Sequence, residues 1–190
     1  MEHIVIDNFL DKKDFEDIQS KVMGRYFPWF YYDTIVKESE RGQIGNQFFN
    51  MHMLYDNDRP TFNTSFELMD PILNKLFQRD DDFKLRTLVR VKINSYPNQN
   101  KFIEHSMHQD FPPSKLPYKT CLFCLNTCDG YTKLEDGTKI DSIANRAIFF
   151  DPTFEHCSTN TTDQPRRVNI NFNYLNMRGN IQEHPQLKRE

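Results

Sequence analysis

Three side chains with metal-binding chemistry stand in an order that suits a single mononuclear site. His108 and Asp110 are two positions apart, and His156 follows 46 positions after Asp110. If residues 108–110 are extended, the first and third side chains point to the same face, so both can bind one ion while His156 approaches from a distant strand. Two imidazoles and one carboxylate on one side of a metal leave its other side open, a ligand set typical of non-haem Fe(II). We therefore predict an Fe(II) site formed by His108, Asp110 and His156.

A His-x-Asp tripeptide alone is a weak signal, because short motifs often occur by chance. Here, however, His156 follows an apolar segment at residues 147–150, and Arg166 and Arg167 open an alternating segment after it. An arginine inside a small pocket needs an anionic partner, since an unpaired buried charge is costly, and a dicarboxylate would supply one. The alternative interpretation is that both arginines are surface charges and that His156 caps a loop.

Other possible metal ligands fit less well. His105 could replace His108, but only His108 has the His-x-Asp spacing to a carboxylate. The sequence also has four cysteines, Cys121, Cys124, Cys128 and Cys157. The Cys-x-x-Cys pair invites a zinc interpretation. It lies in an apolar strand pattern, where positions i and i+3 face opposite sides, so we interpret the cysteines as buried thiols.

The N-terminal part of the chain predicts a short strand and two helices that support the site. Residues 4–6 are apolar and extended in character, and residues 11–24 form an amphipathic helix with Asp11 as a plausible N-cap. A second helix begins near Thr64 or Ser65 and ends near Phe77. We expect both helices to present one apolar face to a sheet.

From residue 84 onward the pattern changes to β-strands. Residues 88–94 and 168–174 alternate, residues 118–127 and 147–150 are apolar, and Asp136-Gly137 marks a hairpin turn. The expected fold class is therefore mainly β with flanking helices, a sandwich or barrel with the helices packed on its major sheet. We predict one domain over residues 1–190, with a helical support at about 1–83 and a β core at about 84–176.

Composition sets few further limits. The formal net charge of −3 gives no general attraction to nucleic acid or anionic membranes. The sequence contains no apolar run long enough for a membrane-spanning helix, and its first residues do not resemble a secretory signal. Four cysteines in such a chain are typical of reduced thiols, so we expect a cytoplasmic protein.

Taken together, these segments resemble the Fe(II)- and 2-oxoglutarate-dependent oxygenases, in the prolyl-4-hydroxylase-like branch. The resemblance covers about residues 84–175. The matching pieces are Asn94-Ser95-Tyr96-Pro97, His108-Gln109-Asp110, residues 120–126, Asp129-Gly130-Tyr131-Thr132, Ile148-Phe149-Phe150, His156 and Arg166-Arg167. It implies a double-stranded β-helix, also called a jelly-roll or cupin-like fold, that uses Fe(II), 2-oxoglutarate and O2. The implied reaction is substrate hydroxylation with release of succinate and CO2.

The resemblance also implies roles for individual residues. An arginine should bind the distal carboxylate of 2-oxoglutarate. We prefer Arg167, because Val168, Ile170 and their alternates should face the helices and leave Arg167 facing the barrel, whereas a bulge would favour Arg166. Further predicted pocket residues are Tyr96, Leu122, Cys124 and Asn171. Related enzymes often carry a tyrosine at the position of Cys124, so the grip on the carboxylate can differ in this chain.

The prime substrate is the least determined part of the interpretation. The branch favours a peptidyl, prolyl-type side chain; a nucleobase or another small molecule is the second choice, and a non-enzymatic metal- or ligand-binding β-helix is the third. A nucleic acid is disfavoured by the net charge, although Lys84, Arg86, Arg90 and Lys92 could form a local patch. Residues 27–32 either border a substrate groove or pin the N-terminal segment, and residues 41–47 could act as a lid. The short format also resembles small oxygenases of tailed phages. The sequence predicts no oligomeric state.

Overall fold

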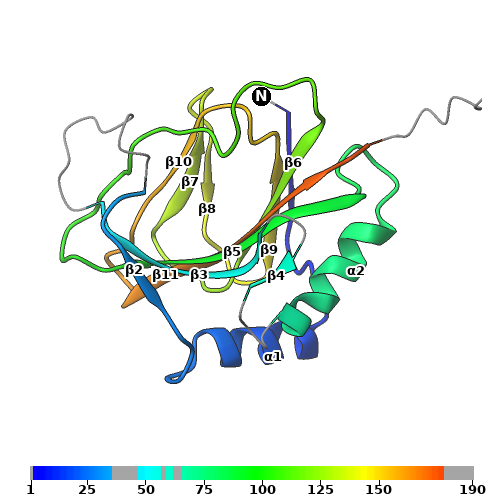
Figure 1. Ribbon diagram of the computed structural model, residues 1–190. Helices are drawn as coiled ribbons and strands as arrows, with labels where there is room; N and C mark the ends of the chain where they lie inside the picture. Colours follow the sequence, from blue (N-terminus) through cyan, green and yellow to red (C-terminus); the bar gives the residue numbers. More distant parts are fainter. Residues whose placement is uncertain (1, 36–46, 57–58, 62–65, 178–190) are drawn as a thin grey trace, which may run out of the picture.

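The computed structural model describes residues 2–35, 47–56, 59–61 and 66–177. The strands of the described chain form two facing β-sheets (Figure 1). The major sheet has the strand order β1-β9-β6-β11-β5-β3-β2, with β4 paired to β3, and the minor sheet has the order β10-β7-β8. The strands of the major sheet are β1 (His3–Ile6), β2 (Phe30–Tyr32), β3 (Phe49–Asp56), β4 (Arg59–Pro60), β5 (Thr87–Pro97), β6 (Tyr118–Cys124), β9 (Arg146–Phe150) and β11 (Arg166–Leu175). Those of the minor sheet are β7 (Tyr131–Leu134), β8 (Lys139–Asp141) and β10 (His156–Ser158).

The helices cover the outer face of the major sheet (Figure 1). They are α1 (Lys12–Val22) and α2 (Asp70–Gln78), the latter preceded by the 3-10 turn η2 (Phe66–Met69). Phe15, Ile18 and Val22 of α1 are buried in one apolar cluster with the sheet, as their spacing predicts. Asp11 occupies the N-cap position of α1, but its side chain makes no capping hydrogen bond. The predicted caps of the second helix lie outside the described residues.

Strand β11 separates an apolar layer from a polar layer. Val168, Ile170, Phe172 and Tyr174 belong to the helix-side core, and the residues between them face the minor sheet. This confirms the predicted alternation, which follows from the two-residue period of a strand. A second apolar cluster fills the space between the two sheets and comprises Leu122, Cys124, Leu134, Ile140, Ile148 and Phe150. The mainly β, jelly-roll class with helices on the major sheet is therefore confirmed.

The N-terminal part contributes strands as well as helices. The first 83 residues are not only a helical support, because β1 pairs with β9 and β3 pairs with β5 in the major sheet. Strands from the beginning of the chain therefore lie on both sides of β6 and β11 in the major sheet. Phe30–Tyr32 form the edge strand β2 and are exposed, whereas Phe27 packs against the core.

The cysteines and the hairpin behave as their patterns predict. Cys121 faces the helix-side core, whereas Cys124 faces the cluster between the sheets. The two thiols of the Cys-x-x-Cys pair therefore lie on opposite faces of β6. Gly137 has a φ of 87° in the turn between β7 and β8, a backbone conformation that glycine adopts without strain. Among the described residues, none of the helices is long and apolar enough to cross a membrane.

Candidate metal centre

The three predicted ligands come together between the sheets. One ligand atom from each of His108, Asp110 and His156 lies within 4.8 Å of the others. The two histidines face each other across an antiparallel bridge, in which each backbone N–H donates to the other residue's carbonyl at 2.9 Å. His108 and Asp110 do not lie on one regular strand, as the spacing suggested; His108 belongs to this isolated bridge and Asp110 to the bend that follows. The backbone leaves the sheet there because Asp110 N donates to Pro152 O instead.

Both imidazoles are oriented for metal binding. His108 Nδ1 lies 3.3 Å from Ser106 O, and His156 Nδ1 lies 3.1 Å from Phe154 O. A carbonyl oxygen can only accept a hydrogen bond, so Nδ1 is the protonated donor in each ring. The lone pair is then on Nε2, the atom left free for a metal. Burial lowers the pKa of His108 to about 4, which keeps this imidazole neutral near pH 7.

Asp110 is held as an anion by three donors. Arg90 Nη2 donates to Oδ1 at 2.8 Å, and Asn171 Nδ2 and Asn173 Nδ2 each donate to Oδ2 at 3.0 Å. The side chain of Asp110 is only 4% exposed. Burial alone would raise its pKa, but the neighbouring charges of Arg90 and Lys92 outweigh this effect and hold the pKa well below its usual range. The carboxylate is therefore ionised and fixed in position for a cation.

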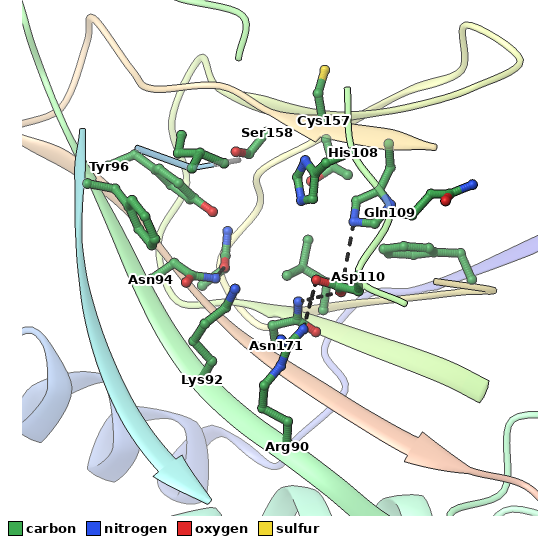
Figure 2. Close-up of a pocket in the computed structure, with 17 residues that line it drawn as sticks. Arg90, Lys92, Asn94, Tyr96, His108, Gln109, Asp110, Cys157, Ser158 and Asn171 are labelled. Atoms are coloured by element: carbon green, nitrogen blue, oxygen red, sulfur yellow. Dashed lines mark hydrogen bonds and ion pairs between the residues drawn. The ribbon is translucent and has the colours of Figure 1, made fainter. Parts of the chain in front are cut away.

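The ligands open into a cavity of about 220 Å³ between the sheets (Figure 2). Its walls come from β3, β5, β6, β7, β9, β10 and β11, and from Ile35. Of the predicted site residues, Tyr96, Leu122 and Asn171 line this cavity beside the ligands. Cys124 is buried in the apolar layer behind Leu122 and does not reach the cavity. The Cys124 side chain therefore packs among apolar residues and does not contact the cavity.

Arg167 is fully buried behind the cavity wall, where it contacts Thr132 and lies 5.8 Å from the Tyr96 ring. Its Nη1 donates to Tyr131 O at 2.7 Å and to Thr159 O at 3.2 Å, and its Nη2 donates to Thr132 Oγ1 at 2.8 Å. Its Nε has no partner among the described residues. A guanidinium has five N–H donors, so Nε–H and the second Nη2–H remain available on one side of the group.

Gly130 makes room for this arginine. A Cβ atom at Gly130 would lie 2.8 Å from Arg167 Cδ and 2.4 Å from Asn160 O, closer than real contacts allow. Any side chain there would displace Arg167 or the backbone. Arg166 points to the other face of the sheet, where its Nη2 donates to Met23 O at 2.8 Å and its guanidinium lies 5.3 Å from the Trp29 ring. The register between β11 and β5 is unbroken at this end, which leaves no bulge to exchange the two arginines.

Several polar atoms in or behind the cavity wall have no hydrogen-bond partner among the described residues. They are His105 Nε2, Asn94 Oδ1, Asn169 Nδ2, Asn171 Oδ1 and Arg167 Nε. Unpaired buried polar groups are costly, so this concentration indicates a polar ligand that satisfies them. His105 is not the metal ligand in place of His108: its Nδ1 lies 2.9 Å from Ser158 Oγ and its ring packs 5.3 Å from Tyr96.

Several residues of the cavity wall are not among the predicted site residues, and three of them are Arg90, Lys92 and Asn94. Arg90, Lys92 and Asn94 alternate along β5 and face the metal ligands, whereas Val91 and Ile93 face the helices. We had interpreted Arg90 and Lys92 as members of a possible surface patch. The same two-residue alternation that placed Arg167 could have placed them, because β5 lies next to β11. His52, apart from the cavity, is buried with its Nδ1 2.7 Å from Pro28 O.

Several solved structures resemble this chain in fold. A prolyl hydroxylase from Trichoplax adhaerens, in complex with a hypoxia inducible factor peptide fragment, has a TM-score of 0.59 and 16% identity, over 90% of this chain and 83% of that one. An oxidoreductase of the 2OG-Fe(II) oxygenase family from Burkholderia pseudomallei has a TM-score of 0.60 and 15% identity, over 90% of this chain and 85% of that one. The α-ketoglutarate-dependent carbocyclase SnoK from nogalamycin biosynthesis has a TM-score of 0.61 and 11% identity, over 91% of this chain and 79% of that one.

No protein-family model matches the sequence, and no curated protein matches it significantly. At identities this low, the structural similarity establishes the fold alone. The chain has the double-stranded β-helix fold of the 2OG-Fe(II) oxygenases, as its motifs predicted.

Proposed function

We propose that this protein is an Fe(II)- and 2-oxoglutarate-dependent dioxygenase. The observation that carries the proposal is the group His108, Asp110 and His156, with both Nε2 atoms and an ionised carboxylate converging in a cavity. Two histidines and one carboxylate are the ligand set of non-haem Fe(II) oxygenases, and the fold is theirs. Bound iron with 2-oxoglutarate would supply the oxidising power, and the protein would orient the reactants and exclude water.

Arg167 is the residue that we assign to the distal carboxylate of 2-oxoglutarate. Its unpartnered Nε–H and remaining Nη2–H form a side-on fork that matches a carboxylate. Thr132 lines the cavity and accepts from Arg167, so its hydroxyl proton is free to donate to the same carboxylate. Tyr96 stands on the neighbouring strand directly opposite Arg167 and completes the polar end of the cavity. Asn171 instead serves the metal side, since its amide donates to Asp110.

For the prime substrate we propose a peptidyl side chain of the prolyl type. The support is a structural neighbour that binds a peptide and a cavity of about 220 Å³, smaller than the range of about 300–1,000 Å³ common for whole small ligands. Once 2-oxoglutarate is bound, such a cavity admits a side chain rather than a large molecule. A small-molecule substrate is the second candidate, since SnoK shares the fold. A binding protein without turnover is the third.

The test is an anaerobic titration of the metal-free protein with Fe(II) and 2-oxoglutarate, followed by admission of oxygen. We expect a weak visible charge-transfer band and then formation of succinate. Asp110→Ala and His108→Ala should abolish both, because two remaining ligands cannot hold the metal in the same geometry. His52→Gln is the matched control, since it removes a buried histidine that packs against Phe27 outside the cavity. Succinate formation retained in Asp110→Ala would refute the assignment, and binding without any turnover would favour the third candidate.

A further inference from the structure

Lys92 is a cation in the cavity wall that forms no direct ion pair with a described residue, although the charge of Asp110 acts on it. It lies in the middle of β5, opposite Asn171 of β11, and its ammonium points into the cavity beside Asn94 and Asn171 (Figure 2). Among the described residues, no hydrogen bond or ion pair joins Lys92 to a partner. Burial lowers its pKa to about 8, so most of the side chain is still protonated at pH 7. A desolvated ammonium without a partner indicates that a ligand supplies one.

Arg90, the neighbouring cation on β5, already has partners in the protein. Arg90 donates through Nη2 to Asp110 Oδ1 and through Nε to Asn173 Oδ1 at 2.9 Å. Asp110 therefore has a counter-ion and amide donors that contact it directly, and Lys92 acts on it only through its charge. Asn94 Oδ1 and Asn171 Oδ1, which flank Lys92, are unpartnered acceptors. They can accept two of the three ammonium protons, which leaves at least one donor directed at a ligand.

Lys92 is also separate from the anion site at Arg167. Tyr96 is the β5 residue opposite Arg167, whereas Lys92 is opposite Asn171. Four residues along a strand span about 13 Å, so the two side chains leave the major sheet at well-separated positions, and of the two only Lys92 lines the cavity. In the proposed enzyme the distal carboxylate of 2-oxoglutarate pairs with Arg167 and its keto-acid end binds the metal. Lys92 then remains as a cation that the distal carboxylate does not pair with.

We propose that Lys92 binds an anionic group of the prime substrate, a carboxylate carried close to the position that reacts. This inference rests on the proposed oxygenase function and specifies its substrate class. In a peptide, the carboxylate would belong to an acidic side chain at or next to the modified residue; in a small molecule, it would be part of an organic acid. The unpaired ammonium would select such substrates over their neutral isosteres, since a neutral ligand leaves the charge buried and unmatched.

The test compares a charged and a neutral probe of the same shape. The probes are the N-acetyl, C-amide derivatives of aspartate and asparagine, titrated into protein loaded with Mn(II) and 2-oxoglutarate. Relaxation of the acetyl protons by Mn(II) reports binding beside the metal. We expect the wild type to prefer the aspartate probe roughly tenfold, about 1.4 kcal/mol. Lys92→Met should abolish the preference and Lys92→Arg should retain most of it, while the exposed control Arg86→Met should behave as the wild type.

Three results would overturn the proposal. The first is no preference for the charged probe in the wild type, and the second is an unchanged preference in Lys92→Met. The third is an aspartate probe that competes with 2-oxoglutarate, accompanied by weaker 2-oxoglutarate binding in Lys92→Met, which would place Lys92 in the co-substrate site. If Mn(II) and 2-oxoglutarate fail to bind the wild type, the proposed function fails separately. The charge preference is then measured by saturation transfer on metal-free protein, where its dependence on Lys92 still decides the anion site.

Discussion

Arg166 and Arg167 are adjacent in sequence but act on opposite sides of the major sheet. Arg166 ties the end of α1 to the sheet through Met23 O and Trp29. Arg167 crosses the space between the sheets and keeps one edge of its guanidinium unpaired. The difference follows from one residue of strand register, because consecutive side chains point to opposite faces. Of the two arginines, only Arg167 lies on the side of the sheet that faces the cavity.

Arg167→Lys should weaken 2-oxoglutarate binding. A lysine keeps the charge but loses the planar fork, so we expect the dissociation constant to rise by roughly 10- to 100-fold, equivalent to about 1.5–3 kcal/mol. The measurement is calorimetric titration of 2-oxoglutarate into Mn(II)-loaded protein. Arg166→Met is the neighbouring control, in which we expect near-normal affinity and a loss of stability. If Arg166→Met weakened 2-oxoglutarate binding and Arg167→Lys did not, the assignment would be reversed.

At the scale of strands, the alternation of apolar and polar residues predicts which face is covered in β11 but not in β5. In β11 the even-numbered residues 168–174 are all apolar, so the sequence alone identified the face that meets the helices. In β5, Arg90 and Lys92 alternate with Val91 and Ile93, a pattern equally typical of a strand with one solvated face. Only the pairing of β5 with β11 shows that its polar face is covered. Such long-range pairing is what a local pattern cannot determine.

The pairing of strand β1 with β9 is also a long-range contact that the local sequence pattern does not determine. It pairs with β9 along residues 3–6, and Ile4 and Ile6 pack against the core. Deleting residues 1–7 should expose the edge of β9 and lower the free energy of unfolding by about 2–4 kcal/mol, with increased aggregation. Urea unfolding and light scattering would measure both effects. Asp7→Asn, which only removes the exposed ion pair with Arg146, should cost below about 1 kcal/mol. A deletion no more harmful than Asp7→Asn would show that β1 contributes little.

At the scale of the whole molecule, the protein has an apolar layer under the helices and a polar layer between the sheets. The polar layer buries histidines beside Arg167, and desolvation lowers the pKa of His105 to about 3 and that of His108 to about 4. In the unfolded chain both would titrate near the ordinary value of about 6.5. The unfolded state therefore binds more protons below that pH, and the folded state loses stability as the pH falls. Fixed neutral imidazoles thus limit the stability of the metal-free protein in acid.

His105→Gln should make the metal-free protein less sensitive to acid. Each histidine that stays neutral when folded and protonates when unfolded costs about 1.4 kcal/mol per pH unit below its unfolded pKa. His105 is 4% exposed, so this slope applies with little screening. Urea unfolding at pH 7, 6, 5 and 4.5 should show a slope shallower by about that amount in His105→Gln. Ser158→Ala removes the hydrogen bond to His105 Nδ1 but leaves the imidazole, so it should keep the wild-type slope. Equal slopes in His105→Gln and the wild type would mean that His105 titrates alike in both states, and that the polar layer is more hydrated than its burial indicates.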